Sequence, residues 1–241
     1  MINKPFDAYA AEYDAWFLQN RHVLESEVLL LKHFLADPGR ALSVGCGSGL
    51  FEHVLRTEHG IDIRWGVEPA SGMASIAKKR GMMVKSGTAE QLPFANAEFD
   101  TVLLNGTPSY LDNLAQAFAE AHRVLRPSGA IVVADVPAES SYALLYRLAA
   151  VLGTWDDPFL RSVAPATPYP VEFAAAARWR TTDEKAKLLA TAGFVDLECA
   201  QTLTVHPKYS NATVEQPSEG YERGDYVAIR ARKRQLVEPA D

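Results

Sequence analysis

Cysteine is scarce in this sequence, and long hydrophobic runs are missing. Its 241 residues include two cysteines, Cys46 and Cys199, which are far apart and lack the spacing of metal ligands, so we expect no metal site. No apolar stretch approaches the ~20 residues of a membrane-spanning helix, and the first seven residues lack the apolar core of a signal peptide. These absences predict a cytoplasmic protein without a membrane partner.

Positive charge is also in short supply. The chain has 24 Lys and Arg against 30 Asp and Glu, a net charge of −6. Non-specific nucleic-acid binding depends on neutralising phosphates, so we expect no nucleic-acid partner. A hydrophobic content of 48% with 22% charged residues is ordinary for a globular protein and large enough for a substantial core. The length suits one large α/β domain, as a monomer or a homodimer.

The most informative stretch runs from Ala41 to Glu68. It predicts a buried strand, a glycine-rich turn, a helix ended by a glycine, and a second strand that ends in the carboxylate. Because Gly45, Gly47 and Gly49 have no β-carbon, the turn can be tight and a ligand can lie against bare backbone. The helix directs its amide end at the same point. We therefore predict a nucleotide-type site in which Glu68 accepts hydrogen bonds from ribose hydroxyls.

Three interpretations of this turn compete. The dinucleotide fingerprint Gly-x-Gly-x-x-Gly fails at Leu50, because the third glycine comes one residue early. A phosphate-binding loop needs a Gly-Lys-Ser/Thr ending, but no lysine occurs between Arg40 and Lys78. The third interpretation is an ordinary strand-to-helix turn that binds nothing.

The residues from Leu42 to Gly49 read Leu-Ser-Val-Gly-Cys-Gly-Ser-Gly. They resemble the first motif of class I S-adenosylmethionine-dependent methyltransferases, which commonly reads Leu-Asp-Val-Gly-Cys-Gly-Thr-Gly. Ser43 replaces the usual acid, which in relatives helps to hold the methionine end of the cofactor. The resemblance implies S-adenosyl-L-methionine as the cofactor.

Three other segments resemble the same family. Residues 87–94 read Gly-Thr-Ala-Glu-Gln-Leu-Pro-Phe, with Thr88 in place of the acid in the family segment that wraps the adenine. Residues 120–129 closely resemble the family's Glu-x-x-Arg-Val-Leu-Lys-Pro-Gly-Gly. Tyr13-Asp-Ala-Trp16 is similar to the N-terminal segment that folds over the cofactor in small-molecule methyltransferases. Within the class, the chain resembles the ubiquinone and menaquinone biosynthesis group.

The resemblance places the site residues at the ends of successive strands and on the N-terminal helix. The predicted cofactor-binding residues are Tyr13, Gly45, Cys46, Gly47, Glu68, Pro69, Met73, Thr88, Ala89, Glu90, Asn105 and Gly106. For Cys46, packing as a small buried residue is the favoured interpretation. Tyr9 and Trp16, on one helix face, and Tyr110 are predicted to bind the acceptor, although such a stripe also suits simple packing.

The sequence predicts a Rossmann-like α/β fold. Alternating strands and helices favour a seven-stranded, mostly parallel sheet with helices on both faces. In the class, the seventh strand inserts antiparallel between the fifth and the sixth. We expect one domain, 1–241, made of a helical cap (1–36), a cofactor-binding core (37–136), an insertion (137–180) and a sheet-closing half (181–234). Asn20 and Asp112 are the expected helix caps.

The insertion interrupts the strand–helix repeat and is rich in proline and aromatic residues. Its length favours a lid over the site rather than a structural cover. An aromatic wall suits a planar or apolar small-molecule acceptor. Four arginines, at positions 147, 161, 178 and 180, also allow an acidic group on that acceptor.

The resemblance implies methyl transfer to a small molecule without a metal, mainly by positioning and by exclusion of water. No catalytic dyad stands out, so the catalytic residues are unknown; His206, His122 and Glu172 are candidates for a base. Two alternatives remain. A nicotinamide-dependent oxidoreductase would share half of the fold, but the sequence has no Tyr-x-x-x-Lys. A non-catalytic binding module would explain the departures at Ser43 and Thr88.

Overall fold

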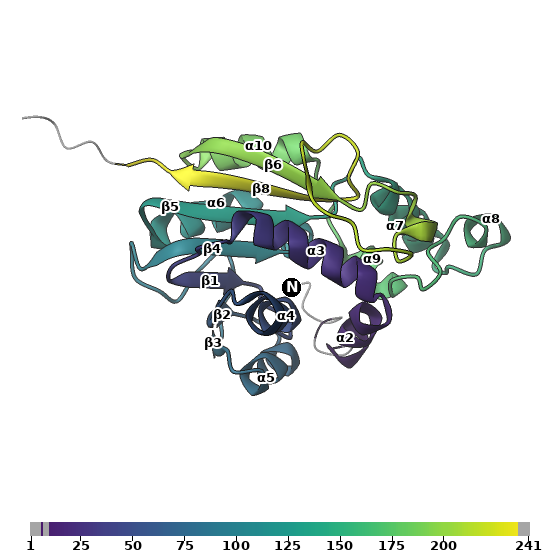
Figure 1. The fold of residues 1–241 in the computed structure, drawn as a ribbon, viewed down its shortest axis with the longest axis horizontal. Coiled ribbons are helices and arrows are strands. Elements are labelled where there is room, and N and C mark those ends of the chain that lie inside the picture. The colour runs from purple at the N-terminus through teal and green to yellow at the C-terminus, as the bar shows by residue number, and fades with distance from the viewer. Residues whose placement is uncertain (1–5, 7–9, 236–241) are drawn as a thin grey trace, which may run out of the picture.

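The computed structural model describes residue 6 and residues 10–235. Its centre is one eight-stranded sheet with the strand order β3-β2-β1-β4-β5-β8-β6-β7 (Figure 1). The strands are β1 (Ala41–Val44), β2 (Trp65–Val67), β3 (Met83–Lys85), β4 (Phe99–Asn105), β5 (Leu125–Asp135), β6 (Phe194–Thr202), β7 (Ser218–Glu219) and β8 (Tyr226–Lys233).

The strands from β3 to β5 pair in parallel, and β8 runs antiparallel between β5 and β6. This confirms the expected mostly parallel sheet and its antiparallel strand. The structure differs from the prediction in one strand, because β7 adds a two-residue pairing with Ala200 and Gln201 of β6. A pairing of two exposed residues leaves no hydrophobic alternation in the sequence by which it could be recognised.

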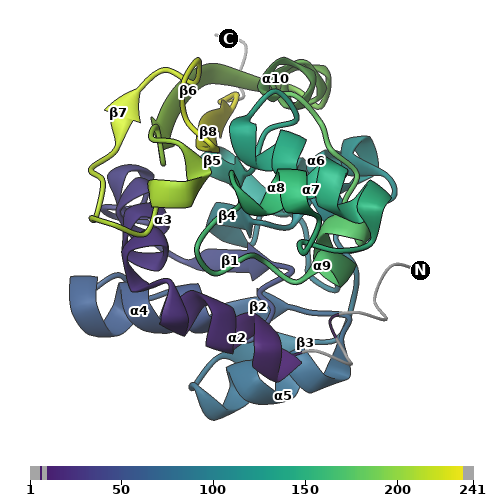
Figure 2. The same ribbon diagram turned by 90° about the vertical axis from the view of Figure 1, so that its right-hand side faces the viewer.

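Helices cover both faces of this sheet. Helix α3 packs on one face over β5, β8 and β6, while α6 and α10 pack on the other (Figures 1 and 2). The helices are α2 (Ala10–Gln19), α3 (Arg21–Phe34), α4 (Leu50–His59), α5 (Ser71–Lys79), α6 (Leu114–Val124), α7 (Ser141–Leu152), α8 (Pro158–Arg161), α9 (Val171–Ala176) and α10 (Thr182–Thr191).

Two of the expected helix caps are wrong in detail. Asn20 precedes α3, but its side chain donates to the Trp16 carbonyl instead of capping the helix. The cap of α6 is Asn113, one residue after Asp112, and its side chain accepts from the Gln116 amide. Either residue type can cap a helix, so the sequence alone does not choose between neighbours.

The N-terminal helix α2 is tied to the glycine turn by a buried polar cluster. Ser48 Oγ donates to Asp14 Oδ1 over 2.5 Å, and Arg80 Nη2 lies 2.8 Å from Asp14 Oδ2. Arg80 also donates to the Ser48 carbonyl. These bonds hold α2 beside the turn between β1 and α4.

The insertion packs against α2 and against itself. Trp16 Nε1 donates to the Thr167 carbonyl over 2.9 Å, and Trp155 Nε1 donates to the Tyr169 carbonyl over 2.8 Å. The Tyr146 and Tyr169 rings stack with their centroids 5.6 Å apart. Helices α7 and α9 therefore stand near the carboxyl ends of the parallel strands (Figure 1). Within the described residues, no helix is both long and apolar enough to span a membrane.

Candidate active site

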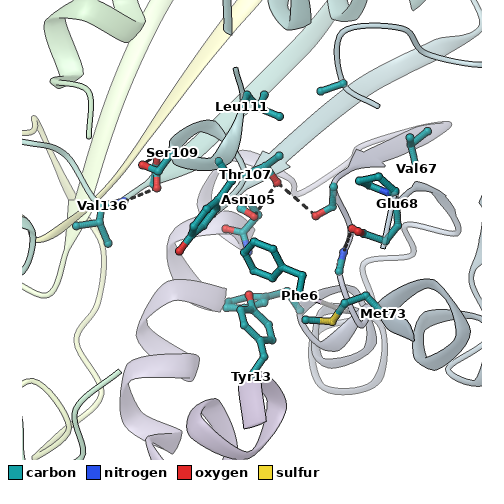
Figure 3. A pocket seen from close by; sticks show the side chains of 18 of the residues that line it. Phe6, Tyr13, Val67, Glu68, Met73, Asn105, Thr107, Ser109, Leu111 and Val136 are labelled. Carbon is teal, nitrogen blue, oxygen red and sulfur yellow. Dashed lines mark hydrogen bonds between the residues drawn. The ribbon is translucent and has the colours of Figure 1, made fainter. Parts of the chain in front are cut away.

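A cavity of about 220 Å³ lies at the carboxyl ends of the parallel strands, between the sheet, α2, α3 and the insertion (Figure 3). Eleven of the twelve predicted cofactor-binding residues line it. They are Tyr13, Gly45, Gly47, Glu68, Pro69, Met73, Thr88, Ala89, Glu90, Asn105 and Gly106.

The glycine turn forms one wall of the cavity, and its glycines have distinct roles. Gly45, Gly47 and Gly49 all have a positive φ, between 54° and 70°. A β-carbon at Gly45 would lie 2.6 Å from Thr107 Cγ2, and one at Gly49 would lie 2.6 Å from the Met82 sulfur. At Gly47 a β-carbon would meet no atom within 4 Å, because this residue faces the cavity. Gly47 is thus the position where a ligand can approach bare backbone.

The Glu68 carboxylate is held in place by backbone amides. Gly47 N donates to Glu68 Oε2 and Ala70 N donates to Glu68 Oε1, both over 2.8 Å. Figure 3 shows this side chain at the edge of the cavity beside the turn. A carboxylate has about four acceptor sites on its two oxygens, and it is a group of the type that accepts hydrogen bonds from hydroxyls. This arrangement suits a ribose.

Ser43, which replaces the family's acid, is paired with a carboxyl from another element. Ser43 Oγ donates to Glu52 Oε1 over 2.6 Å, and both residues are buried. Glu52 comes from the first turn of α4 and lines a small cavity together with Tyr13 and the glycine turn. Burial raises the pKa of Glu52, while the Ser43 bond opposes that shift. The structure therefore supplies an acid next to the position where the motif lacks one.

The end of β4 supplies polar groups on the opposite side. Tyr226 Oη donates to Asn105 Oδ1 over 2.8 Å, which orients the Asn105 amide. Thr107 Oγ1 donates to the Val44 carbonyl over 3.0 Å and so joins the loop after β4 to the end of β1. These bonds fix the distance between two neighbouring strand ends at the cavity.

Among the predicted site residues that the structure describes, Cys46 does not line this cavity. The Cys46 side chain packs with Ala74, Ala77, Met82 and Val84, which agrees with the favoured packing role. A β-carbon added at Gly66 would lie only 2.6 Å from the Cys46 sulfur, so the thiol fills the space beside this glycine. Tyr9 lies outside the described residues. The other two predicted acceptor residues, Trp16 and Tyr110, do line the cavity.

The insertion contributes aromatic side chains rather than charged ones. Tyr146, Tyr169 and Trp179 line the cavity. Among the insertion's arginines, those at 147 and 161 are exposed, the one at 178 pairs with Asp112, and the one at 180 donates to backbone carbonyls. None of the four lines the cavity, so the proposed recognition of an acidic acceptor by these arginines has no support here.

The three histidine and glutamate candidates for a base also lie elsewhere. The described lining of the cavity includes none of these three residues, His122, His206 and Glu172. His122 is half-buried against Gly193, and burial with the Lys233 charge lowers its pKa. His206 Nδ1 accepts from the Lys208 amide, and Glu172 is exposed. The described residues also hold no group of three or more His, Cys, Asp or Glu arranged to bind a metal.

Sequence reasoning missed three carboxyl groups in the cavity, Glu27, Asp112 and Asp135, of which Asp112 was expected only as a helix cap. Asp135 is the last residue of β5, and so occupies the same kind of strand end as Glu68. Glu27 lies within the apolar face of α3, beside the buried residues Leu24 and Val28. A carboxylate in such a stripe is the one sequence signal that could have identified it.

Comparisons with known proteins agree with this geometry. A family model of a methyltransferase domain matches residues 42–133. An uncharacterized protein of Methanocaldococcus jannaschii is 30% identical over 95% of this chain and 98% of its own length. A crystal structure from Thermotoga maritima, described as a SAM-dependent methyltransferase and possible histamine N-methyltransferase, is 32% identical. It has a TM-score of 0.83 and covers 97% of this chain and 100% of that one.

This chain belongs to the S-adenosylmethionine-dependent methyltransferases. Its cofactor is S-adenosyl-L-methionine, and the bare backbone at Gly47 and the fixed carboxylate of Glu68 fit that molecule. A malonyl-[acyl-carrier protein] O-methyltransferase of Geobacter sulfurreducens is a more partial relative of this methyltransferase. It is 32% identical over 53% of this chain and 50% of its own length.

Substitution of Gly47 by alanine tests whether the turn is a binding surface. In Gly47→Ala the new methyl group enters the cavity, whereas in Gly60→Ala it enters open space at the end of α4, with a similar positive φ. Both variants should lose roughly 1–2 kcal/mol of unfolding free energy from backbone strain. Only Gly47→Ala should weaken S-adenosylhomocysteine binding, by about tenfold or more in calorimetry. Equal affinities in the two variants would contradict this assignment.

Proposed function

We propose that this methyltransferase methylates a small molecule held in the part of the cavity between α2, α3 and the insertion. The observation that carries the proposal is the continuity of the cavity. One set of walls, from Gly47 and Glu68 to Tyr146 and Trp179, joins the cofactor side to an aromatic side. Aromatic walls suit the burial of a small ligand.

The protein contributes to this reaction by positioning the acceptor and by keeping water out of the cavity. The cofactor, when bound, supplies a methyl group on a positively charged sulfur. Trp16 and Tyr169, whose rings meet edge to face at 5.0 Å, bring α2 and the insertion together over the cavity. Such a cover orients the acceptor and excludes water, which favours a transfer in which charge is lost. The narrower resemblance to the ubiquinone and menaquinone group stays a prediction.

We also propose that Glu52 takes over the role of the acid missing at Ser43. Its carboxyl bonds to Ser43 and lines the small cavity beside Tyr13 and the glycine turn. A carboxylate there would attract the ammonium group at the methionine end of the cofactor. On this proposal, helix α4 supplies the acid that is missing at Ser43. The serine is then no sign that the site has lost its ability to bind the cofactor.

Comparing two ligands tests the role of Glu52. S-adenosylhomocysteine carries the amino-acid end, and 5′-methylthioadenosine lacks it. Glu52→Gln should weaken the first about tenfold, roughly 1.4 kcal/mol, and leave the second unchanged. Glu68→Ala, which removes the proposed ribose contact, should weaken both by roughly 1.5–3 kcal/mol. If Glu52→Gln weakens both ligands equally, or neither of them, Glu52 does not hold the amino-acid end.

The proposed function as a whole is tested by following the methyl group. The purified methyltransferase is incubated with methyl-labelled S-adenosylmethionine and a cell extract that has been fractionated into small molecules, protein and nucleic acid. We expect label in the small-molecule fraction, with less label for Gly47→Ala than for the Gly60→Ala control. Calorimetry should show S-adenosylhomocysteine binding and no measurable NAD binding. Label confined to protein or nucleic acid would overturn the proposal.

A further inference from the structure

Glu27 is a buried acid in the cavity for which the described residues offer no hydrogen-bond or ion-pair partner. Its side chain comes from α3, is only 5% exposed and lines the cavity. Among the described residues, no group donates a hydrogen bond to its carboxyl or forms an ion pair with it, and only burial and the charge of Asp135 act on its pKa. A buried carboxyl without a partner costs free energy unless a ligand supplies one.

The other cavity carboxyls have their partners within the protein. Asp135 accepts from Ser109 Oγ over 2.7 Å and from the Val136 amide over 2.9 Å, and Lys185 Nζ lies 3.7 Å away. Asp112 pairs with Arg178 over 2.6 Å at the rim. The two glutamates nearer the cofactor, at 68 and 90, accept from backbone amides. Glu27 differs from all of them.

The cavity also lacks a positive side chain that could attract an acid. Its described lining includes five carboxyl groups and no lysine, arginine or histidine. Of the arginines beside the cavity, Arg178 pairs with Asp112, and Arg180 directs its guanidinium to the carbonyls of Pro108 and Leu111. Charge complementarity therefore favours a cationic ligand over an anionic one.

Tyrosines from three elements lie within electrostatic reach of the Glu27 carboxyl. Its negative charge contributes to raising the pKa of Tyr13 on α2, of Tyr142 and Tyr146 on α7, and of Tyr226 on β8, and burial is the larger cause in each case. Three of these four rings line the cavity, at positions 13, 146 and 226. A carboxylate among aromatic rings is an environment that suits a cation through both charge and cation–π attraction.

We propose that the methyl acceptor is a small amine and that the Glu27 carboxylate binds its nitrogen. This inference rests on the proposed function and specifies the substrate class for the same site. Glu27, Tyr146 and Tyr226 come from α3, α7 and β8 rather than from the glycine turn, whereas Tyr13 also borders that turn. The acidic acceptor that the insertion's arginines allowed is thereby replaced by a basic one.

Glu27 also provides a destination for a proton. The carboxylate takes one proton from the bound ammonium, which frees the nitrogen lone pair. That lone pair forms the new C–N bond as the C–S bond breaks, and the sulfur keeps the electron pair of the broken bond. Burial and the charge of Asp135 raise the pKa of Glu27, which makes it a better proton acceptor than an ordinary carboxylate.

Matched ligands test the proposal on the full chain saturated with S-adenosylhomocysteine. The probes carry a phenyl, indole or imidazole ring, each with an aminoethyl, hydroxyethyl or carboxymethyl group. In at least one ring series, calorimetry should show the amine binding about tenfold or more tightly than the alcohol and the acid. Glu27→Gln should remove most of this preference while leaving the affinity for the alcohol unchanged.

Glu25→Gln is the matched control. It makes the same change on the same helix, at a residue that faces His59, at 3.2 Å, and does not line the cavity. This variant should keep the wild-type preference for amines. Binding of no amine, preferential binding of the acids, or an unchanged preference in Glu27→Gln would each overturn the inference. Failure of S-adenosylhomocysteine itself to bind would instead overturn the proposed function on which the inference rests.

Discussion

The site depends on the sharp turn between β1 and α4. The amides of Gly45 and Cys46 both donate to the Val67 carbonyl, and the Gly47 amide donates to Glu68. The turn is thereby bonded to the end of β2, and Thr107 bonds it to the loop after β4. Three strand ends are fixed around one piece of exposed backbone. Only glycine adopts these φ values without strain, so the conformation of the turn is set by its sequence.

The rest of the cavity is assembled from segments far apart in the chain. Asp14 fastens α2 to Ser48 and Arg80, and the Trp16 indole reaches the insertion at Thr167. In the proposed function, the cofactor is held mainly at the strand ends, whereas the acceptor lies mainly against the helices packed on the sheet. Such a division lets one part of a chain hold the common cofactor while other parts determine the acceptor.

Eleven of the twelve residues that the sequence predicted for the cofactor line one cavity in the structure, because the signals that brought them together are local. Gly47 and Glu68 belong to one strand–turn–helix–strand unit, whose geometry follows from the alternation of apolar strands and glycines. The acceptor side could not be predicted in the same way. Glu27 faces the cavity only because α3 packs across the sheet, and Glu52 meets Ser43 only because of how α4 rotates after the turn. Tertiary packing decides both positions, and one sequence does not specify it.

The carboxyl groups of Glu68 and Glu27 lie in different electrostatic environments within the cavity. The carboxylate of Glu68 is held by amides, so it is ready to accept hydrogen bonds. Glu27 is buried in the cavity that Tyr13, Tyr146 and Tyr226 also line, and no amide of the described residues donates to it. An acid that is stabilised by the backbone suits neutral hydroxyls, whereas an acid without a partner suits a charged ligand. Under these proposals, side chains of one charge type serve separate functions within one cavity.

The most direct test of this account is a crystal structure of the complex with S-adenosylhomocysteine. The account predicts that the ribose hydroxyls lie within hydrogen-bonding distance of Glu68 and that the amino-acid end lies beside Glu52. The sulfur should face the part of the cavity that contains Glu27 and Tyr226. A ribose bound away from Glu68, or a sulfur directed to solvent rather than to the aromatic walls, would contradict it.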